Sequence, residues 1–173
     1  MIGATGGIGS AVADQLGGRA DFADVVSFGR RSSPPVDVTD EASIAGAAAA
    51  LRADGRPVRL VFDTTGVLHD ADGLQPEKTY RQIDPAMMAR AFAVNAIGPA
   101  LLMKHLLPLL PTDGKSVFAT LSAKVGSIGD NHIGGWYSYR ASKAALNQLL
   151  RTASVEVARR HPDAICLALH PGT

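Results

Sequence analysis

The chain has 173 residues, of which 46% are apolar, 19% charged and 5% aromatic. Lys and Arg number 17 against 16 Asp and Glu, which argues against a dedicated nucleic-acid binder because such proteins carry a basic excess. A chain of this length buries roughly 70% of its unfolded surface, so we expect a single domain spanning residues 1–173. The lone cysteine, Cys166, excludes an internal disulfide.

Targeting and metal-binding signals are missing from the sequence. The longest apolar stretch, residues 97–110, is interrupted by Lys104 and His105 and falls short of the ~20 residues that a membrane span needs. Met1 is not followed by the charged start and apolar run of a secretory signal. The five histidines show no metal-ligand spacing. We therefore expect a cytoplasmic protein without a membrane partner, a nucleic-acid partner or a metal.

Apolar runs alternate with helical patterns along the chain. The predicted strands cover residues 25–28, 36–38, 58–62, 116–121 and 164–169, and the predicted helices cover residues 8–16, 40–52, 84–110 and 136–160. The strands are continuous apolar runs, as in a parallel sheet that is buried on both faces. The pattern predicts an α/β fold: a Rossmann-like, doubly wound parallel sheet in three α/β/α layers. Ligands of such sheets bind beyond the carboxyl ends of the strands.

A glycine-rich turn precedes the first predicted helix. Gly3, Gly7 and Gly9 fit the spacing G-x-x-x-G-x-G, while Gly3, Gly6 and Gly9 fit G-x-x-G-x-x-G. Glycines there let the backbone approach a phosphate, and the start of the helix offers free N–H groups. The turn therefore predicts a nucleotide site, with an ordinary Ala/Gly turn as the alternative. The absence of a following Gly-Lys-Ser/Thr argues against a P-loop ATPase.

Two arginines, Arg30 and Arg31, follow the predicted strand at residues 25–28. In dinucleotide folds an acidic residue at this place binds the ribose hydroxyls of NAD, whereas arginine accommodates the extra phosphate of NADP. The arginines favour NADP(H) over NAD(H), and a solvated basic turn is the alternative.

The last predicted helix carries Tyr139 and Lys143 in its first turns, four residues apart and so on one face. A lysine beside a phenol stabilises the phenolate and lowers the pKa of the tyrosine from about 10. Such a tyrosine can pass a proton to a carbonyl oxygen. Since this spacing is common in helices, the other motifs decide whether the pair is catalytic.

Five motifs stand in one order: the glycine turn at 3–9, Asp37-Val38, Asn95-Ala96-Ile97-Gly98-Pro99, Tyr139-Arg140-Ala141-Ser142-Lys143 and Pro171-Gly172. In this order and these contexts, the chain resembles the short-chain dehydrogenase/reductase family over essentially its whole length. The segment from Gly129 to Lys143 is similar to the C-factor-like and sniffer-type carbonyl reductases.

The resemblance implies a role for each matching residue. Tyr139 is implied as the general acid/base, Lys143 as the group that binds the nicotinamide ribose and tunes Tyr139, and Asn95 as the holder of a relay water. The implied catalytic set is Asn95, Ser122, Tyr139 and Lys143. The implied cofactor-binding set is Gly3, Thr5, Gly6, Gly7, Ile8, Gly9, Arg30, Arg31, Asp37, Val38, Thr64, Thr65, Gly66, Asn95, Tyr139, Lys143, Pro171, Gly172 and Thr173.

The sequence departs from the family pattern at three places. Asp63-Thr64-Thr65-Gly66 replaces the usual Asn-Asn-Ala-Gly. Ala123 occupies the usual position of the catalytic serine, and Ser122, one residue earlier, faces the other side if the chain is extended there. We assign the role to Ser122, with Ser127 as the alternative. Residues 29–35 are too few for a helical crossover, so we expect no helix there.

These observations predict an NADP(H)-dependent oxidoreductase that reduces a small carbonyl compound or oxidises the alcohol. The alternatives are a cofactor-binding signalling or regulatory protein with little turnover, and an epimerase or lyase of the extended branch. The family implies a homodimer or homotetramer. Only Met1 and Ile2 precede the glycine turn, and Thr173 stands where the family's substrate lid begins, so we expect further residues at both ends.

Overall fold

The computed structural model of the protein describes residues 1–172 and is built around a parallel sheet. Its regular strands are β1 (Leu60–Asp63), β2 (Ser116–Leu121) and β3 (Ala164–Leu169), paired in the order β1-β2-β3. Leu60 lies opposite Val117, and Val117 lies opposite Ile165. The predicted parallel sheet is therefore confirmed.

Ile2 extends this sheet beyond β1. It forms parallel bridges to Asp63 on one side and to Phe28 on the other. The Ile2 N–H donates to the Phe62 oxygen at 2.9 Å, and the Gly3 N–H donates to the Phe28 oxygen at 2.9 Å. The sheet thus continues from β1 through Ile2 to Phe28.

The strands predicted at residues 25–28 and 36–38 are confirmed only at Phe28. Val36 and Val38 are buried, but no strand forms at residues 36–38. The Val36 N–H donates to the Gly29 oxygen at 2.9 Å, so the chain folds back on itself here. As expected from the short connection, residues 29–40 contain no helix.

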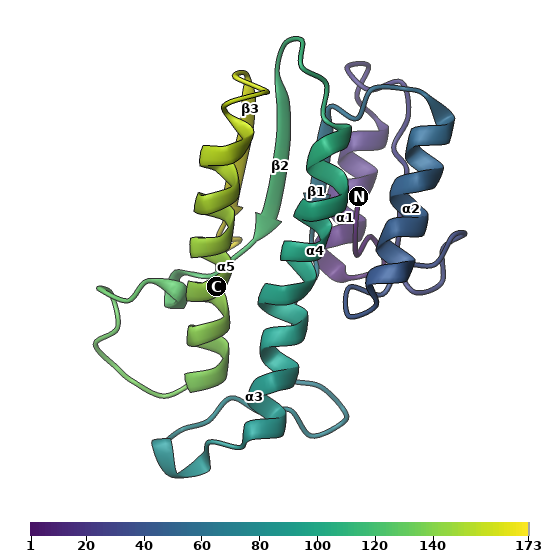
Figure 1. The fold of residues 1–173 in the computed structure, drawn as a ribbon. Coiled ribbons are helices and arrows are strands. Elements are labelled where there is room, and N and C mark those ends of the chain that lie inside the picture. The colour runs from purple at the N-terminus through teal and green to yellow at the C-terminus, as the bar shows by residue number, and fades with distance from the viewer. Residues whose placement is uncertain (173) are drawn as a thin grey trace.

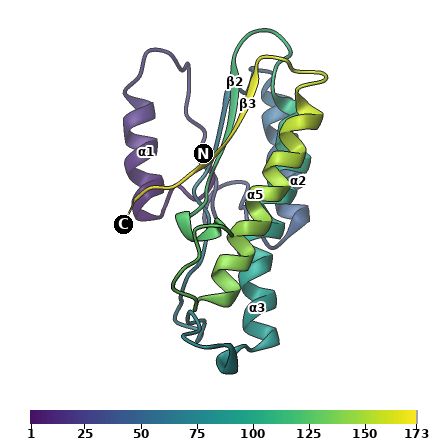
Figure 2. The same ribbon diagram turned by 90° about the vertical axis from the view of Figure 1, so that its left-hand side faces the viewer.

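Helices cover both faces of the sheet, which confirms the three-layer α/β arrangement (Figures 1 and 2). The helix α1 lies on one face, and α2, α4 and α5 lie on the other. Their bounds are Gly7–Gly17 for α1, Glu41–Asp54 for α2, Gly98–Leu106 for α4 and Tyr137–Val157 for α5. The core between the sheet and the second layer contains Ile44, Leu102, Leu106 and Phe118, each at most 2% exposed.

The helix predicted at residues 84–110 consists of several consecutive segments. They are α3 (Pro85–Phe92), a π-helical turn (Ala93–Ile97), α4 and a 3₁₀ turn (Leu107–Leu109). The Asp84 carboxylate accepts from the Met87 N–H at 2.9 Å and begins the helix, as its sequence predicts.

This composite helix corrects the membrane argument made from the sequence. Pro85–Leu109 is 25 residues long and apolar enough, by length and composition alone, to cross a membrane. The interrupting residues therefore do not shorten the stretch as expected. Because Leu102 and Leu106 are buried in the core of the fold, the same composition is also explained by packing inside the protein.

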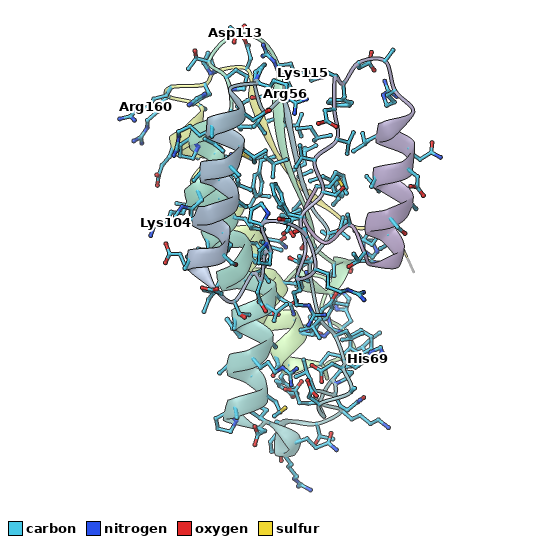
Figure 3. All side chains as sticks on the ribbon, turned by 90° about the vertical axis from the view of Figure 1, so that its right-hand side faces the viewer. Arg56, His69, Lys104, Asp113, Lys115 and Arg160 are labelled. Carbon is cyan, nitrogen blue, oxygen red and sulfur yellow. The ribbon has the colours of Figure 1, made fainter. Side chains whose placement is uncertain are left out.

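The carboxyl ends of the strands all face one end of the molecule. Arg56 and Lys115, which precede β1 and β2, lie near one end, whereas His69, in the loop after β1, lies toward the other (Figure 3). The chemistry-bearing residues are expected at the His69 end.

Candidate active site

Tyr139 and Lys143 lie one turn apart on α5, with the lysine beneath the aromatic ring. The Lys143 ammonium is 5.8 Å from the centroid of the Tyr139 ring, a cation–π geometry. Lys143 is 2% exposed, while Tyr139 is half-buried. The structure therefore brings together the two residues that the sequence pairs.

The Lys143 ammonium is anchored to the end of β2. Its Nζ donates to the Leu121 oxygen at 2.8 Å. Burial lowers the pKa of Lys143 from 10.5 to about 8, and the negative charge of Asp63 opposes this shift. Burial raises the pKa of Tyr139 above 10, which is opposite to the direction expected from the sequence. The reason is that desolvation of the ring acts on the tyrosine, while Nζ bonds to a carbonyl instead of the phenol.

Asp63, at the end of β1, is a buried acid that sequence reasoning did not select as a site residue. It is fully buried, and its carboxylate accepts from the Thr65 N–H at 2.9 Å, the Thr65 hydroxyl at 2.6 Å and the Thr120 hydroxyl at 2.7 Å. Burial raises the pKa of Asp63, and these hydrogen bonds and Lys143 oppose the shift. An acid that directly follows a buried strand is the signal that could have identified it.

Asn95 sits in the π-helical turn, a kind of irregularity that is frequent at functional sites. It is fully buried, its Oδ1 accepts from the Val67 N–H at 2.8 Å, and its Nδ2 donates to the Val67 oxygen at 2.8 Å. Its Nδ2 also donates to the Ser142 hydroxyl at 3.2 Å. Asn95 thus clamps the loop after β1 to α5.

At Gly66 the same loop passes close to Lys143 and Asn95. A Cβ at Gly66 would lie 3.3 Å from Lys143 Nζ and 3.5 Å from Asn95 Oδ1. The main chain of Gly66 therefore converges with the lysine and the asparagine that the sequence assigns to one site.

Ser122 bonds to a different part of α5. Its hydroxyl donates to Asn147 Oδ1 at 2.7 Å, and the residue is 7% exposed. Asn147 lies two helical turns beyond Tyr139, about 12 Å along α5. The neighbouring Ala123 carries no hydroxyl, and the alternative Ser127 is exposed in the following loop. The Ser122 hydroxyl is therefore bonded to a side chain two helical turns beyond Tyr139 on α5.

The glycine turn has two positions where only glycine fits. Gly3 has φ +79°, and a Cβ at Gly9 would lie 2.2 Å from the Gly3 oxygen. A Cβ at Gly7 would meet nothing within 4 Å. The residue before α1, Gly6, provides no side-chain cap, so the first N–H groups of α1 are free to bind an anion.

The hydroxyls of two threonines after β1 form hydrogen bonds within the protein. The Thr64 hydroxyl donates to the Ile2 oxygen at 2.8 Å and contacts the Gly3 oxygen at 3.1 Å, so it holds the glycine turn. Thr65 bonds to Asp63 as described above. These side chains fix the backbone around the turn.

The remaining cofactor candidates lie around the same end of the sheet. Arg30 and Arg31 are exposed, and the charge of Arg30 contributes, after the hydrogen bonds from Thr39, to a lowered pKa of Asp37. Val38 is buried against Gly98. Pro171 and Gly172 line the same open groove as Gly7 and Ile8, where the chain leaving β3 reaches α1 (Figure 2). Thr173 lies outside the described residues.

Two partly open pockets lie at different distances from this site. An apolar cavity of about 310 Å³ lies between Phe22, Val58 and Leu106, beside Met1 and away from Tyr139. A more polar cavity of about 470 Å³ borders Trp136, Glu77 and Met87. Because Trp136 packs against Tyr139, the second cavity is the one adjacent to the tyrosine.

Sequence comparisons point to one family. A family model described as enoyl-(acyl carrier protein) reductase matches residues 3–164. A 1-hydroxy-2-glutathionyl-2-methyl-3-butene dehydrogenase from Rhodococcus sp. strain AD45 is 33% identical over 184 residues, 99% of this chain and 75% of that protein. The C-signal protein of Myxococcus xanthus is 39% identical over 90 residues, 52% of this chain and 53% of that protein.

Solved structures share the fold over 99% of the chain. A short-chain dehydrogenase/reductase from Burkholderia multivorans with bound NADP is 26% identical, with a TM-score of 0.82 and 77% of that chain covered. An NADPH-bound carbonyl reductase from chicken fatty liver is 29% identical, with a TM-score of 0.78 and 77% covered. The carbonyl reductase Sniffer of Caenorhabditis elegans, at 24% identity, matches in fold with a TM-score of 0.85 and 83% covered. The chain belongs to the short-chain dehydrogenase/reductase family of oxidoreductases.

Proposed function

We propose that the protein is an NADP(H)-dependent oxidoreductase that interconverts small carbonyl compounds and alcohols, with Tyr139 as the general acid/base. The observation that carries this proposal is the convergence of Tyr139, Lys143, Asn95 and the main chain of Gly66 at the carboxyl end of the sheet. The NADP(H) found in two structurally similar proteins supports the cofactor class.

The residues around the glycine turn fit a dinucleotide. The start of α1 is free of a side-chain cap, and the backbone at Gly7 is open to an approaching phosphate. Arg30 and Arg31 are exposed where a ribose phosphate would need a cation. We assign Thr5, Pro171 and Gly172 to the same site. When bound, the nicotinamide supplies or accepts the hydride.

Tyr139 is the proposed proton donor to a carbonyl oxygen. Burial raises the pKa of its phenol, which keeps the hydroxyl protonated at neutral pH but also makes it a weaker acid, so proton transfer needs a group that stabilises the phenolate. The Lys143 cation beneath the ring stabilises the phenolate that results. Asn95 holds Val67, and with it the loop that carries Gly66, in place. In alcohol oxidation the same groups act in reverse.

A second candidate is a cofactor-binding regulator with little turnover. Two observations favour it: the Ser122 hydroxyl is bonded to Asn147, and the chain is 39% identical to the Myxococcus C-signal protein over 90 residues. This protein would bind the dinucleotide yet transfer hydride slowly, because Ala123 provides no hydroxyl to polarise the carbonyl.

The proposal extends to the domain, the assembly and the location of the protein. We assign residues 1–173 to one dinucleotide-binding domain. We propose a homodimer or homotetramer formed through α3, α4 and α5, and a cytoplasmic location. Analytical ultracentrifugation of the protein tests the assembly, since a monomer at micromolar concentration contradicts it.

Titration with NADPH and NADH, followed by assays on a panel of aldehydes and ketones, tests the proposed function. We expect tighter binding of NADPH and measurable carbonyl reduction. Tight binding without turnover on the whole panel supports the regulator. Absence of binding to either dinucleotide contradicts both candidates, and tighter binding of NADH contradicts the role of Arg30.

A further inference from the structure

We infer that Glu77 is a positioning residue for Tyr139, because its carboxylate caps the start of α5 from the loop between β1 and α3. The kinetic test of this inference rests on the proposed function, whereas the fluorescence test of the Glu77 cap does not. Glu77 carries no assignment from the motifs of the sequence.

The first turn of α5 lacks a cap of its own. Trp136 precedes the helix with φ 55° and ψ 42°, and its side chain makes no capping hydrogen bond. An indole has no oxygen to accept from the free N–H groups of a first turn, which normally bond to a Ser, Thr, Asp or Asn side chain. The start of this helix therefore needs an acceptor from elsewhere.

Glu77 supplies that acceptor from 61 residues upstream. Its Oε2 accepts from the Ser138 N–H at 3.1 Å, and its Oε1 accepts from the same N–H at 3.3 Å and from the Ser138 hydroxyl. The negative charge also lies at the positive end of the helix dipole. Because Glu77 is only 6% exposed, losing these bonds would leave a buried carboxylate without its partners.

The main chain of Glu77 makes a second attachment. Its oxygen accepts from the Trp136 N–H. Gly135, with φ +69°, passes so close that a Cβ there would lie 3.3 Å from the same oxygen. One residue thus holds both the turn before α5 and the first turn itself.

These attachments act on Tyr139 through its neighbours. Ser138 directly precedes Tyr139, and the Trp136 ring meets the Tyr139 ring edge-on with centroids 6.2 Å apart at 74°. The loop that carries Glu77 also carries Gly66, which lies next to Lys143. One loop therefore caps the helix that carries the tyrosine, through Glu77, and borders the lysine, through Gly66.

Intrinsic fluorescence gives a direct test, because Trp136 is the single tryptophan of the chain. We expect Glu77→Ala to move the emission to longer wavelength and to increase quenching by acrylamide, since the turn before α5 loosens. Glu77→Gln should shift clearly less than Glu77→Ala, because its amide oxygen can replace Oε1, which accepts from both the N–H and the hydroxyl of Ser138. Glu156→Ala, which removes an exposed carboxylate from the same helix, is the matched control.

Steady-state kinetics separates positioning from general stability. We expect Glu77→Ala to lower kcat about tenfold, in line with the loss of one buried acceptor, while the Kd for NADPH stays within about twofold of the wild type. Rescue by Glu77→Gln to within about threefold in kcat supports the same assignment. If no carbonyl is reduced even by the wild type, the proposed function fails and the fluorescence result still decides the role of Glu77.

Three outcomes overturn the inference. The first is a folded Glu77→Ala protein with the emission and quenching of the wild type. The second is Glu77→Gln displaced as far as Glu77→Ala, which excludes the hydrogen bonds as the cause. If Glu77→Ala does not fold, Ser138→Ala replaces it: a shift in the same direction supports the cap, and an unchanged spectrum is the third contrary outcome.

Discussion

The ammonium of Lys143 donates a hydrogen bond to the main-chain oxygen of Leu121 at 2.8 Å, so a cation from α5 lies at the carboxyl end of β2. In this position the side chain lies beneath the Tyr139 ring and is almost fully removed from water. A buried cation costs stability, and the chain retains it where the proposed reaction needs a positive charge.

The burial of Lys143 predicts a pH dependence of stability. The pKa of the lysine is lowered to about 8 in the folded protein against 10.5 when exposed. Between these values the unfolded chain binds more protons, so the free energy of unfolding should rise with pH from about 8 to 10.5, by a few kcal/mol in total. Urea unfolding of the wild type and of Lys143→Met measures it. The rise should be missing from the variant, and equal slopes contradict the assignment.

The contact between Ser122 and Asn147 predicts a structural role for the serine. Ser122→Ala should lower the free energy of unfolding by about 1 kcal/mol, as loss of one hydrogen bond does, and leave kcat within about threefold. Thermal unfolding and steady-state assays measure both. A loss of more than about 100-fold in Ser122→Ala would make that serine catalytic.

The alanine at position 123 predicts a gain of activity. Ala123→Ser should raise kcat, because it returns a hydroxyl to the position where the family has one. Steady-state assays of the variant and the wild type measure the change.

The glycine turn predicts opposite effects at two neighbouring positions. Gly9→Ala would place a Cβ 2.2 Å from the Gly3 oxygen, so we expect a loss of stability of at least about 2 kcal/mol. Gly7→Ala meets no atom within 4 Å, so stability should change by less than about 1 kcal/mol while the Kd for NADPH rises about tenfold. Calorimetry of folding and of binding checks each arm. Unchanged NADPH binding in Gly7→Ala places the phosphates elsewhere.

Sequence reasoning predicts the elements that have strong local signals. The helices predicted from residues 40 and 84 begin there, with Asp40 and Asp84 as their caps, and the apolar runs at β2 and β3 pair in parallel with the predicted bounds. Residues 36–38 fail as a strand because burial alone does not provide a neighbouring strand with which to pair.

The candidate site is harder to predict, because its properties come from contacts between distant segments. The lysine and the tyrosine pair as the helical spacing indicates, but the direction of the tyrosine's pKa shift depends on desolvation, which the sequence does not reveal. No sequence motif predicts the role of Glu77, because a cap normally lies next to its helix and this one lies 61 residues from Ser138.

Transfer of hydride from NADPH to a carbonyl in a single turnover, by the wild type and by Tyr139→Phe, tests the central claim most directly. We expect the wild type to oxidise bound NADPH and Tyr139→Phe to do so at least about 100-fold more slowly, because the proton donor is lost, with NADPH binding unchanged within about twofold. Equal rates in the two proteins would contradict the role of Tyr139 as the general acid.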